Sequence, residues 1–346
     1  MAILKVDTIS GIGTEGPVFE GDIEFTSQNF LTLPKGDTTQ RGRGRGLIIG
    51  NLLSGTVYNT VQFVNIQSMG NAIDFGDAST TIRNNGALAS STRALSAGGA
   101  TPSTVDTIDF FTIATTSNST DFGNLTAAKS APSPTGNQTR GIWAGAYNYP
   151  AGVYTIDFVT IASTGNAADF GDRANNIHSG TRTAVNSTTR GLIGGGYNPS
   201  PGANVNIIEQ LTIATTGDTT DFGDLTHARN NLGGLSSNTR GVFYGGSGTS
   251  PTPNVNIIDF VTIASAGDAT DFGDLIGNTS SFANSCMSNN IRGLSAGGDT
   301  QPGNAYTNNI QFITIATTGN ASDFGDMIRA GAYFSSTSDS HGGLAE

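Results

Sequence analysis

Residues Arg240–Asp274 read RGVFYGGSGTSPTPNVNIIDFVTIASAGDATDFGD, and both ends of this stretch recur along the 346-residue chain. The tetrapeptide DFGD, with one DFGN variant, and an arginine followed by small, apolar and glycine residues each occur six times, about every 50 residues. The tetrapeptides begin at Asp74, Asp121, Asp169, Asp221, Asp271 and Asp323, and the arginine motifs at Arg45, Arg93, Arg140, Arg190, Arg240 and Arg292. Two independent landmarks with one period indicate six copies of one structural unit.

Each unit has the pattern of short β-strands. Runs such as Val153–Ile161 (VYTIDFVTI) carry β-branched or apolar residues at nearly every second position, which suits a pleated strand. The tetrapeptide is expected to form a short strand or corner, in which Phe points into the core while Gly and Asp form a tight turn. Together with the arginine-led segment and the small-residue stretch before it, these features predict about four strands per unit.

Units of four short strands must pack against one another, either in an open stack or in a closed ring. After the sixth DFGD the chain continues as MIRAGAYFSSTSDSHGGLAE, which matches the stretch between other units, whereas the first unit lacks such a stretch. The sequence therefore predicts an all-β, six-bladed propeller of four strands per blade, closed by N- and C-terminal strands. Seven blades is the alternative if Val18–Leu33 forms a partial blade.

Composition narrows the function. A net charge of −11 disfavours nucleic acid as a partner, and no apolar run approaches the roughly 20 residues of a membrane span. The N-terminus lacks the pattern of a secretory signal, and a single cysteine, Cys286, allows no internal disulfide. We expect no nucleic-acid or membrane partner.

The repeated charged residues favour structural roles. An arginine at one place in every blade is expected to pair with a DFGD carboxylate or to cap strand-end carbonyls of a neighbouring blade; a ligand site around a central channel is the alternative. The aspartates Asp218, Asp221 and Asp224 recur at three-residue spacing in TGDTTDFGD and are interpreted as turn residues, with a Ca²⁺ site as the alternative. No metal or cofactor is predicted.

No catalytic constellation is visible in the sequence. The histidines His178, His227 and His341 are interpreted as exposed turn residues, and Cys286, in a polar stretch without adjacent His or Lys, as a structural thiol. We therefore predict a non-enzymatic protein without catalytic residues. The alternative, an enzyme such as a depolymerase or a galactose-oxidase-like oxidase, would need a metal constellation or a carboxylate pair in one cleft.

The unit resembles a divergent kelch motif, in which an arginine-led strand ends in a diglycine and a variable loop precedes a strand with an aromatic residue. It departs from kelch in the fourth strand, where phenylalanine replaces the expected tryptophan. Those phenylalanines are Phe75, Phe122, Phe170, Phe222, Phe272 and Phe324. The sequences ITIATTGNASDFGD and RGVFYGG more closely resemble repeats in structural proteins of marine tailed bacteriophages, and this resemblance covers roughly residues 45–346.

The N-terminal segment resembles phage appendage proteins. Residues 30–45, FLTLPKGDTTQRGRGR, are similar to the LPxGTTxQRP segment of tail fibres, although Gly42 replaces the proline and the downstream Arg-Tyr-Asn element is absent. The preceding GPVFEGDIEFTSQN resembles the short β-rich repeats of the same proteins. The resemblance implies a virion-anchoring segment at residues 1–44 and a propeller at 45–346, and RGRGRG, which could suggest nucleic acid, is interpreted as a linker or a contact to an acidic subunit.

The expected function is that of a virion structural protein, a tail fibre or other appendage, located in the virion and assembled as a homo-oligomer with other virion proteins. Variable loops at 147–153, 197–205 and 247–255 should gather on one face of the ring. Two alternatives are a host-glycan or host-protein receptor-binding adhesin and a capsid decoration protein. For a glycan, the stacking residues would be Tyr147, Tyr149 and Tyr197.

Overall fold

The computed structural model describes residues 44–148, 151–175, 177–178, 183, 185–248, 255–276, 279–280, 285–300 and 305–344. The chain divides between Arg41 and Gly42, and the described residues all belong to the second unit. Of the predicted anchoring segment at residues 1–44, only Gly44 is described. The partial blade considered for Val18–Leu33 also lies outside the described residues.

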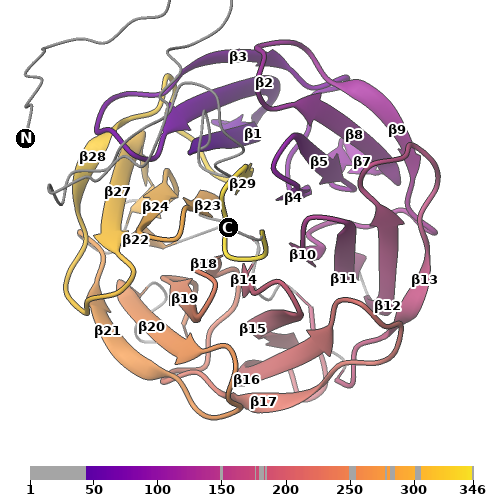
Figure 1. Cartoon of the computed structure of the whole chain (residues 1–346), viewed down its shortest axis with the longest axis vertical. Coiled ribbons are helices and arrows are strands. Elements are labelled where there is room, and N and C mark those ends of the chain that lie inside the picture. Colours follow the sequence, from indigo (N-terminus) through magenta and orange to yellow (C-terminus); the bar gives the residue numbers. More distant parts are fainter. Residues whose placement is uncertain are drawn as a thin grey trace, which may run out of the picture. The chain divides into compact units, whose positions relative to one another are not determined.

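Six four-stranded antiparallel sheets surround a central axis (Figure 1). The innermost strands are β29 (Ser335–Ser338), β4 (Gly86–Ala89), β10 (Ser133–Gly136), β14 (Val185–Asn186), β18 (Gly233–Ser236) and β23 (Ser285–Ser288), for blades 1 to 6 in turn. The second strands are β1 (Arg45–Leu53), β5 (Arg93–Ala97), β11 (Arg140–Asn148), β15 (Arg190–Asn198), β19 (Arg240–Tyr244) and β24 (Arg292–Ala296). This confirms the predicted six-bladed propeller.

The outer half of each blade repeats as regularly. The third strands are β2 (Thr56–Asn65), β8 (Thr107–Thr112), β12 (Ala151–Thr160), β16 (Ala203–Thr212), β20 (Ile257–Thr262) and β27 (Asn309–Thr314). The outermost are β3 (Ile73–Asp77), β9 (Thr120–Asn124), β13 (Ala168–Asp172), β17 (Thr220–Asp224), β21 (Thr270–Asp274) and β28 (Ser322–Asp326). Small additional sheets pair β6 (Ala100–Thr101) with β7 (Ser103–Thr104), and β22 (Thr279–Ser280) and β26 (Ala305–Tyr306) with β25 (Asp299–Thr300).

The two ends of the propeller sequence meet in blade 1. Strand β29 pairs antiparallel with β1, from Gly46 opposite Ser338 to Ile49 opposite Ser335. The first blade thus takes its innermost strand from near the C-terminus, and this confirms the predicted ring closure.

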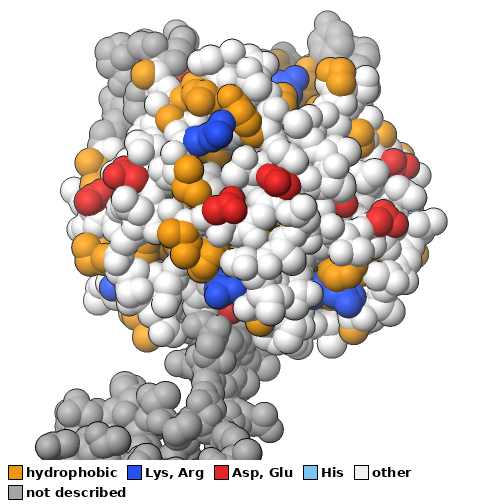
Figure 2. Space-filling model, turned by 90° about the horizontal axis from the view of Figure 1, so that it is seen from above, with side chains coloured by type: hydrophobic (Ala, Val, Ile, Leu, Met, Phe, Trp, Pro, Cys, Tyr) orange, Lys and Arg blue, Asp and Glu red, His pale blue; other side chains and the backbone are white. Residues whose placement is uncertain are grey.

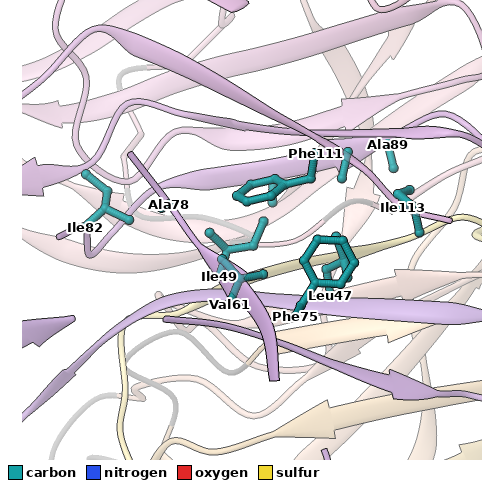
Figure 3. Close-up of a cluster of buried hydrophobic side chains, with 11 residues drawn as sticks. Leu47, Ile49, Val61, Phe75, Ala78, Ile82, Ala89, Phe111 and Ile113 are labelled. Carbon is teal, nitrogen blue, oxygen red and sulfur yellow. The ribbon is translucent and has the colours of Figure 1, made fainter. Parts of the chain in front are cut away.

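The hydrophobic core is divided among the junctions between blades. In the cluster of Figure 3, Leu47, Ile49 and Phe75 of blade 1 pack against Phe111 and Ile113 of blade 2, and all five side chains are fully or almost fully buried. Five further clusters occupy the other junctions. Each Å² of apolar surface buried at these junctions stabilises the fold by about 25 cal/mol, so the clusters hold each blade to its neighbours.

The DFGD motif forms the predicted short strand in every blade, but its glycine is not in a tight turn, so that part of the prediction is wrong. Gly223 lies within β17 at a φ of 150°, and a Cβ there would come within 2.4 Å of the Gly267 carbonyl oxygen in the next blade. Phe222 forms the bulge in the pairing of β17 with β16, and its ring is buried. Glycine is required because two blades approach backbone to backbone at this point.

Candidate functional site

The six repeated arginines connect neighbouring blades through backbone carbonyls. Each heads the second strand of its blade, and its Nη1 donates a hydrogen bond of 2.7–3.1 Å to an isoleucine carbonyl just after the third strand of the next blade. The acceptors are Ile113 for Arg45, Ile161 for Arg93, Ile213 for Arg140, Ile263 for Arg190, Ile315 for Arg240 and Ile66 for Arg292. Because Ile66 belongs to blade 1, the series of contacts closes on itself. We call the end of the propeller where these arginines lie the arginine face.

In five blades the same guanidinium also covers a phenylalanine ring of its own third strand, with 4.2–4.7 Å from Cζ to the ring centroid. These rings are Phe63, Phe110, Phe158, Phe260 and Phe312. Each ring also meets the DFGD phenylalanine of its blade edge to face, with centroids 5.8–6.3 Å apart. A cation above a ring is worth about 0.5–1 kcal/mol at an exposed site and more when desolvated.

The DFGD carboxylates take no part in the arginine contacts. The six motif-leading residues Asp74, Asp121, Asp169, Asp221, Asp271 and Asp323 are exposed on the outermost strands. The ion pairs between described residues join none of them to an arginine. Figure 2 shows acidic side chains spread over a side wall that is mostly uncharged.

The last residue of the tetrapeptide makes a second belt of contacts between blades. Its backbone N–H donates to an Asn or Asp side chain in the next blade, at 2.9–3.1 Å in all six junctions. Asp218 and Asp268, from the aspartate-rich turns, are two of these acceptors. Partial burial, then the charges of Asp268 and Asp221, raise the pKa of Asp224. No group of three metal-ligating side chains occurs among the described residues.

A buried polar position in the third strand was missed by the sequence analysis. It holds Gln62, Asp109, Asp157, Glu209, Asp259 and Gln311 in blades 1 to 6. Each accepts a hydrogen bond from a backbone N–H of the segment that enters from the preceding blade. The available signal was an acid or amide in the middle of an otherwise apolar run, as in IIDFVTI.

Three of these acids form buried ion pairs across the blade junctions. The bonds are Lys129 Nζ to Asp157 at 3.1 Å, Arg173 Nε to Glu209 at 2.6 Å and Arg229 Nη2 to Asp259 at 2.8 Å. Burial lowers the pKa of Lys129, and the charge of Asp157 opposes that shift. Burial likewise lowers the pKa of Arg229 against the opposing charge of Asp259. These charges fix how blades meet, because a buried charge without its partner is costly.

The opposite end of the propeller carries the hairpins between second and third strands, and we call it the loop face. Two of the predicted stacking residues, Tyr147 and Tyr197, meet there on either side of His178, with ring centroids 4.8 and 5.3 Å from its ring. Tyr149 lies outside the described residues. His178 is only 7% exposed, so its interpretation as an exposed turn residue is wrong: backbone bonds to Tyr197 hold it inside the junction of blades 3 and 4. His227 is exposed as predicted.

His341 is the second histidine whose predicted exposure is wrong. After β29 the chain crosses the central channel, where His341 Nε2 donates to the Ala89 carbonyl of blade 2 at 2.8 Å and the backbone N–H of Gly342 donates to Ser236 of blade 5. Ring closure therefore buries this histidine. Cys286, on innermost strand β23, is also buried, and burial raises its pKa to about 12.

Comparison with models of known protein families and with curated proteins gave no match. No helix among the described residues is long and apolar enough to cross a membrane.

Proposed function

We propose that this chain is a non-enzymatic structural protein of a phage virion, a tail fibre or another appendage component. In this proposal residues 1–44 bind other virion proteins, the propeller projects from the particle, and the chain acts as a homo-oligomer. The N-terminal resemblance to tail-fibre segments and the likeness of the repeat to marine-phage proteins support it. We regard the repeat itself as a divergent kelch unit.

The observation that carries the proposal is the unbroken series of arginine contacts around the ring. All six junctions use the same guanidinium-to-carbonyl bond, and all six repeat the amide-to-Asx bond of the outermost strands. These contacts use groups of the chain itself and need no ligand. Such a ring suits a rigid part that holds other surfaces in place.

Variation is concentrated on the loop face, as a display scaffold requires. Blade 1 joins its second and third strands by a two-residue turn, Ser54–Gly55, in which both residues have positive φ. Blade 2 places the small β6–β7 sheet at the equivalent position. Blades 3 and 4 have second and third strands as long as those of blade 1, and in blade 4 the two strands are joined by four residues, 199–202. The loops differ while the contacts beneath them stay the same.

Immunogold electron microscopy of source particles, with antibody raised to residues 45–346, tests the location. Gold at a tail or fibre tip is the expected result. Gold spread over the capsid would instead indicate a decoration protein, and particles without label would overturn the virion proposal.

A second candidate, a receptor-binding adhesin for host glycans, is favoured by the row of Tyr147, His178 and Tyr197 on the loop face. Of the three, Tyr147 is exposed, and an exposed aromatic face can stack against a sugar ring. The test compares binding of the propeller and of Tyr197→Ala to host cells, with Tyr154→Ala as the control because Tyr154 is exposed on β12 outside this row. Equal binding of all three proteins would remove this candidate.

A further inference from the structure

Blade 4 departs from the other five at one position of the arginine face. Where the others place a phenylalanine beneath the repeated arginine, blade 4 has Gln210. Arg190 instead faces the ring of Phe222, with 5.8 Å between its Cζ and the ring centroid. The hydrophobic cluster between blades 4 and 5 correspondingly lacks the partly buried phenylalanine of the third strand that packs against the clusters at the other five junctions.

The missing ring leaves a groove of about 240 Å³. Arg190, Gln210, Thr212, Thr215, Asp218 and Thr220 are among the residues that line it. The threonines and Asp218 are exposed, and Arg190 and Gln210 are half-buried. The groove is therefore open to solvent, mostly polar, and placed at the end of β16 and the start of β17.

Three groups in the groove are each oriented by one bond and keep hydrogen-bonding capacity to spare. Arg190 Nη1 donates to the Ile263 carbonyl, Gln210 Nε2 donates to the Asp221 carbonyl at 3.1 Å, and Asp218 Oδ1 accepts from the Asp172 N–H. A guanidinium has five N–H donors, an amide has an acceptor oxygen, and a carboxylate has a second oxygen. Donors and acceptors held in place by the fold are what a binding site needs.

The charges in the groove balance. The guanidinium of Arg190 and the carboxylate of Asp218 together give the groove no net charge, so it favours neither an anion such as a sugar acid nor a metal cation. A neutral ligand with many hydroxyl groups can donate to Asp218 and Gln210 Oε1 and accept from the guanidinium and the threonine hydroxyls.

We propose that this groove on the arginine face of blade 4 binds one neutral hexose residue of a saccharide. The inference goes beyond the proposed place in a virion and does not require it. Five blades have a phenylalanine ring beneath the repeated arginine, and blade 4 lacks it. A single departure from a packing pattern that otherwise repeats is expected at a functional position. An open site without an aromatic platform should bind weakly, with a Kd on the order of 1 mM for a monosaccharide.

Saturation-transfer NMR on the full chain tests the proposal, with the methyl α-glycosides of glucose, galactose and mannose as probes and glucuronate as the anionic control. The decisive variant is Gln210→Phe, which restores the residue of the other five blades and so should fold. We expect at least one neutral probe to show saturation transfer with the wild type and none with Gln210→Phe. The variant should retain its circular dichroism and have a Tm a few degrees higher, because the ring fills the groove and packs under Arg190.

Every outcome of this experiment bears on the inference. No transfer to any neutral probe, or transfer only to glucuronate, would overturn it. Transfer that persists in Gln210→Phe would place the sugar elsewhere, and loss in Tyr197→Ala would then point to the loop face instead. Tyr154→Ala, on β12 of blade 3 and not among the groove residues, should retain binding and controls for indirect effects. None of these results depends on where antibody labels a particle, so the virion proposal fails or stands separately.

Discussion

Replacing Asp157 by Asn tests whether the buried ion pairs hold the blades together. Lys129 and Asp157 are both fully buried, so the substitution leaves an ammonium group without a counter-charge inside the junction of blades 2 and 3. Breaking a buried pair from one side costs about 3–5 kcal/mol. The matched control is Asp109→Asn, since Asp109 occupies the same strand position, accepts bonds from Ser79 and Ser119, and is in no ion pair with the described residues. Loss of hydrogen bonds to a charged group alone should cost about 1.5–3 kcal/mol.

The pH dependence separates the two variants further. Burial already lowers the pKa of Lys129 from 10.5 and Asp157 opposes that shift, so removing Asp157 lets the folded-state pKa fall further. Between the folded value and 10.5 the unfolded chain binds one more proton, and stability therefore rises with pH. The loss of stability in Asp157→Asn relative to the wild type should therefore shrink between the folded-state pKa of Lys129 in the variant and the higher folded-state pKa in the wild type. It should shrink by up to about 1.4 kcal/mol per pH unit. The deficit of Asp109→Asn should not change in this way.

Urea unfolding followed by fluorescence measures both effects, because Trp143 is the chain's one tryptophan, is fully buried, and donates to the Gly86 carbonyl across the same junction. Midpoints should shift with unchanged m-values. Equal losses for the two variants at pH 7, together with a loss of stability in Asp157→Asn that does not change with pH anywhere below 10.5, would refute the assignment of stability to the ion pair.

Arg240→Ala should lower the free energy of unfolding by about 0.5–1 kcal/mol more than Arg190→Ala, because Arg240 lies 4.2 Å above the Phe260 ring whereas the ring contact of Arg190, with Phe222, is longer at 5.8 Å; equal losses in urea titrations would contradict this. The Cys286 pKa of about 12, against 9.0 ordinarily, should make alkylation of the folded protein at pH 8 about a thousandfold slower than alkylation of the unfolded chain. Because the unfolded thiol ionises first, the wild type should lose stability between pH 9 and 12 more steeply than Cys286→Ala. Fast alkylation without unfolding would count against the buried thiol. Ending the chain at Phe334 removes β29 and leaves β1 without its inner partner, so we expect no folded monomer at 25 °C by circular dichroism and light scattering; a truncated monomer with the wild-type Tm would refute closure through this strand.

The fold could be predicted because its determinants repeat. Arg240 is the first residue of a second strand and Asp271 is the second residue of an outermost strand. Because both recur six times at nearly the same spacing, the repeat can be recognised even though the loops between them vary. The burial of single residues by contacts between distant parts of the chain could not be predicted in the same way. His341 looks like a polar tail residue in sequence, but ring closure carries it into a channel bounded by blades 2 and 5. No local pattern reports that burial.

The buried acids show a different limit. Asp157 sits in a run whose neighbours alternate as in any half-buried strand, and its cation, Lys129, comes from the segment between the preceding blade and its own. Sequence distance alone does not pair them, because Arg173 and Arg229 reach equivalent acids from different offsets after their tetrapeptides. The pairing becomes visible only when blade junctions are built.

A repeat protein offers internal controls that a single-copy fold lacks. The residues common to six blades, such as the arginines and the tetrapeptide glycines, are explained by contacts between blades and therefore say little about ligands. Functional information lies in the departures from the common pattern that packing does not explain. Gln210 is such a departure, since phenylalanine at its position would add ring contacts that five blades retain. The tyrosine row of the loop face has no equal control, because the position of Tyr147 and Tyr197 follows no common pattern and holds Leu52, Ala100 and Ser247 in other blades. For that reason the groove beneath Arg190, rather than the more conspicuous aromatic row, is the site at which one substitution can separate ligand binding from folding.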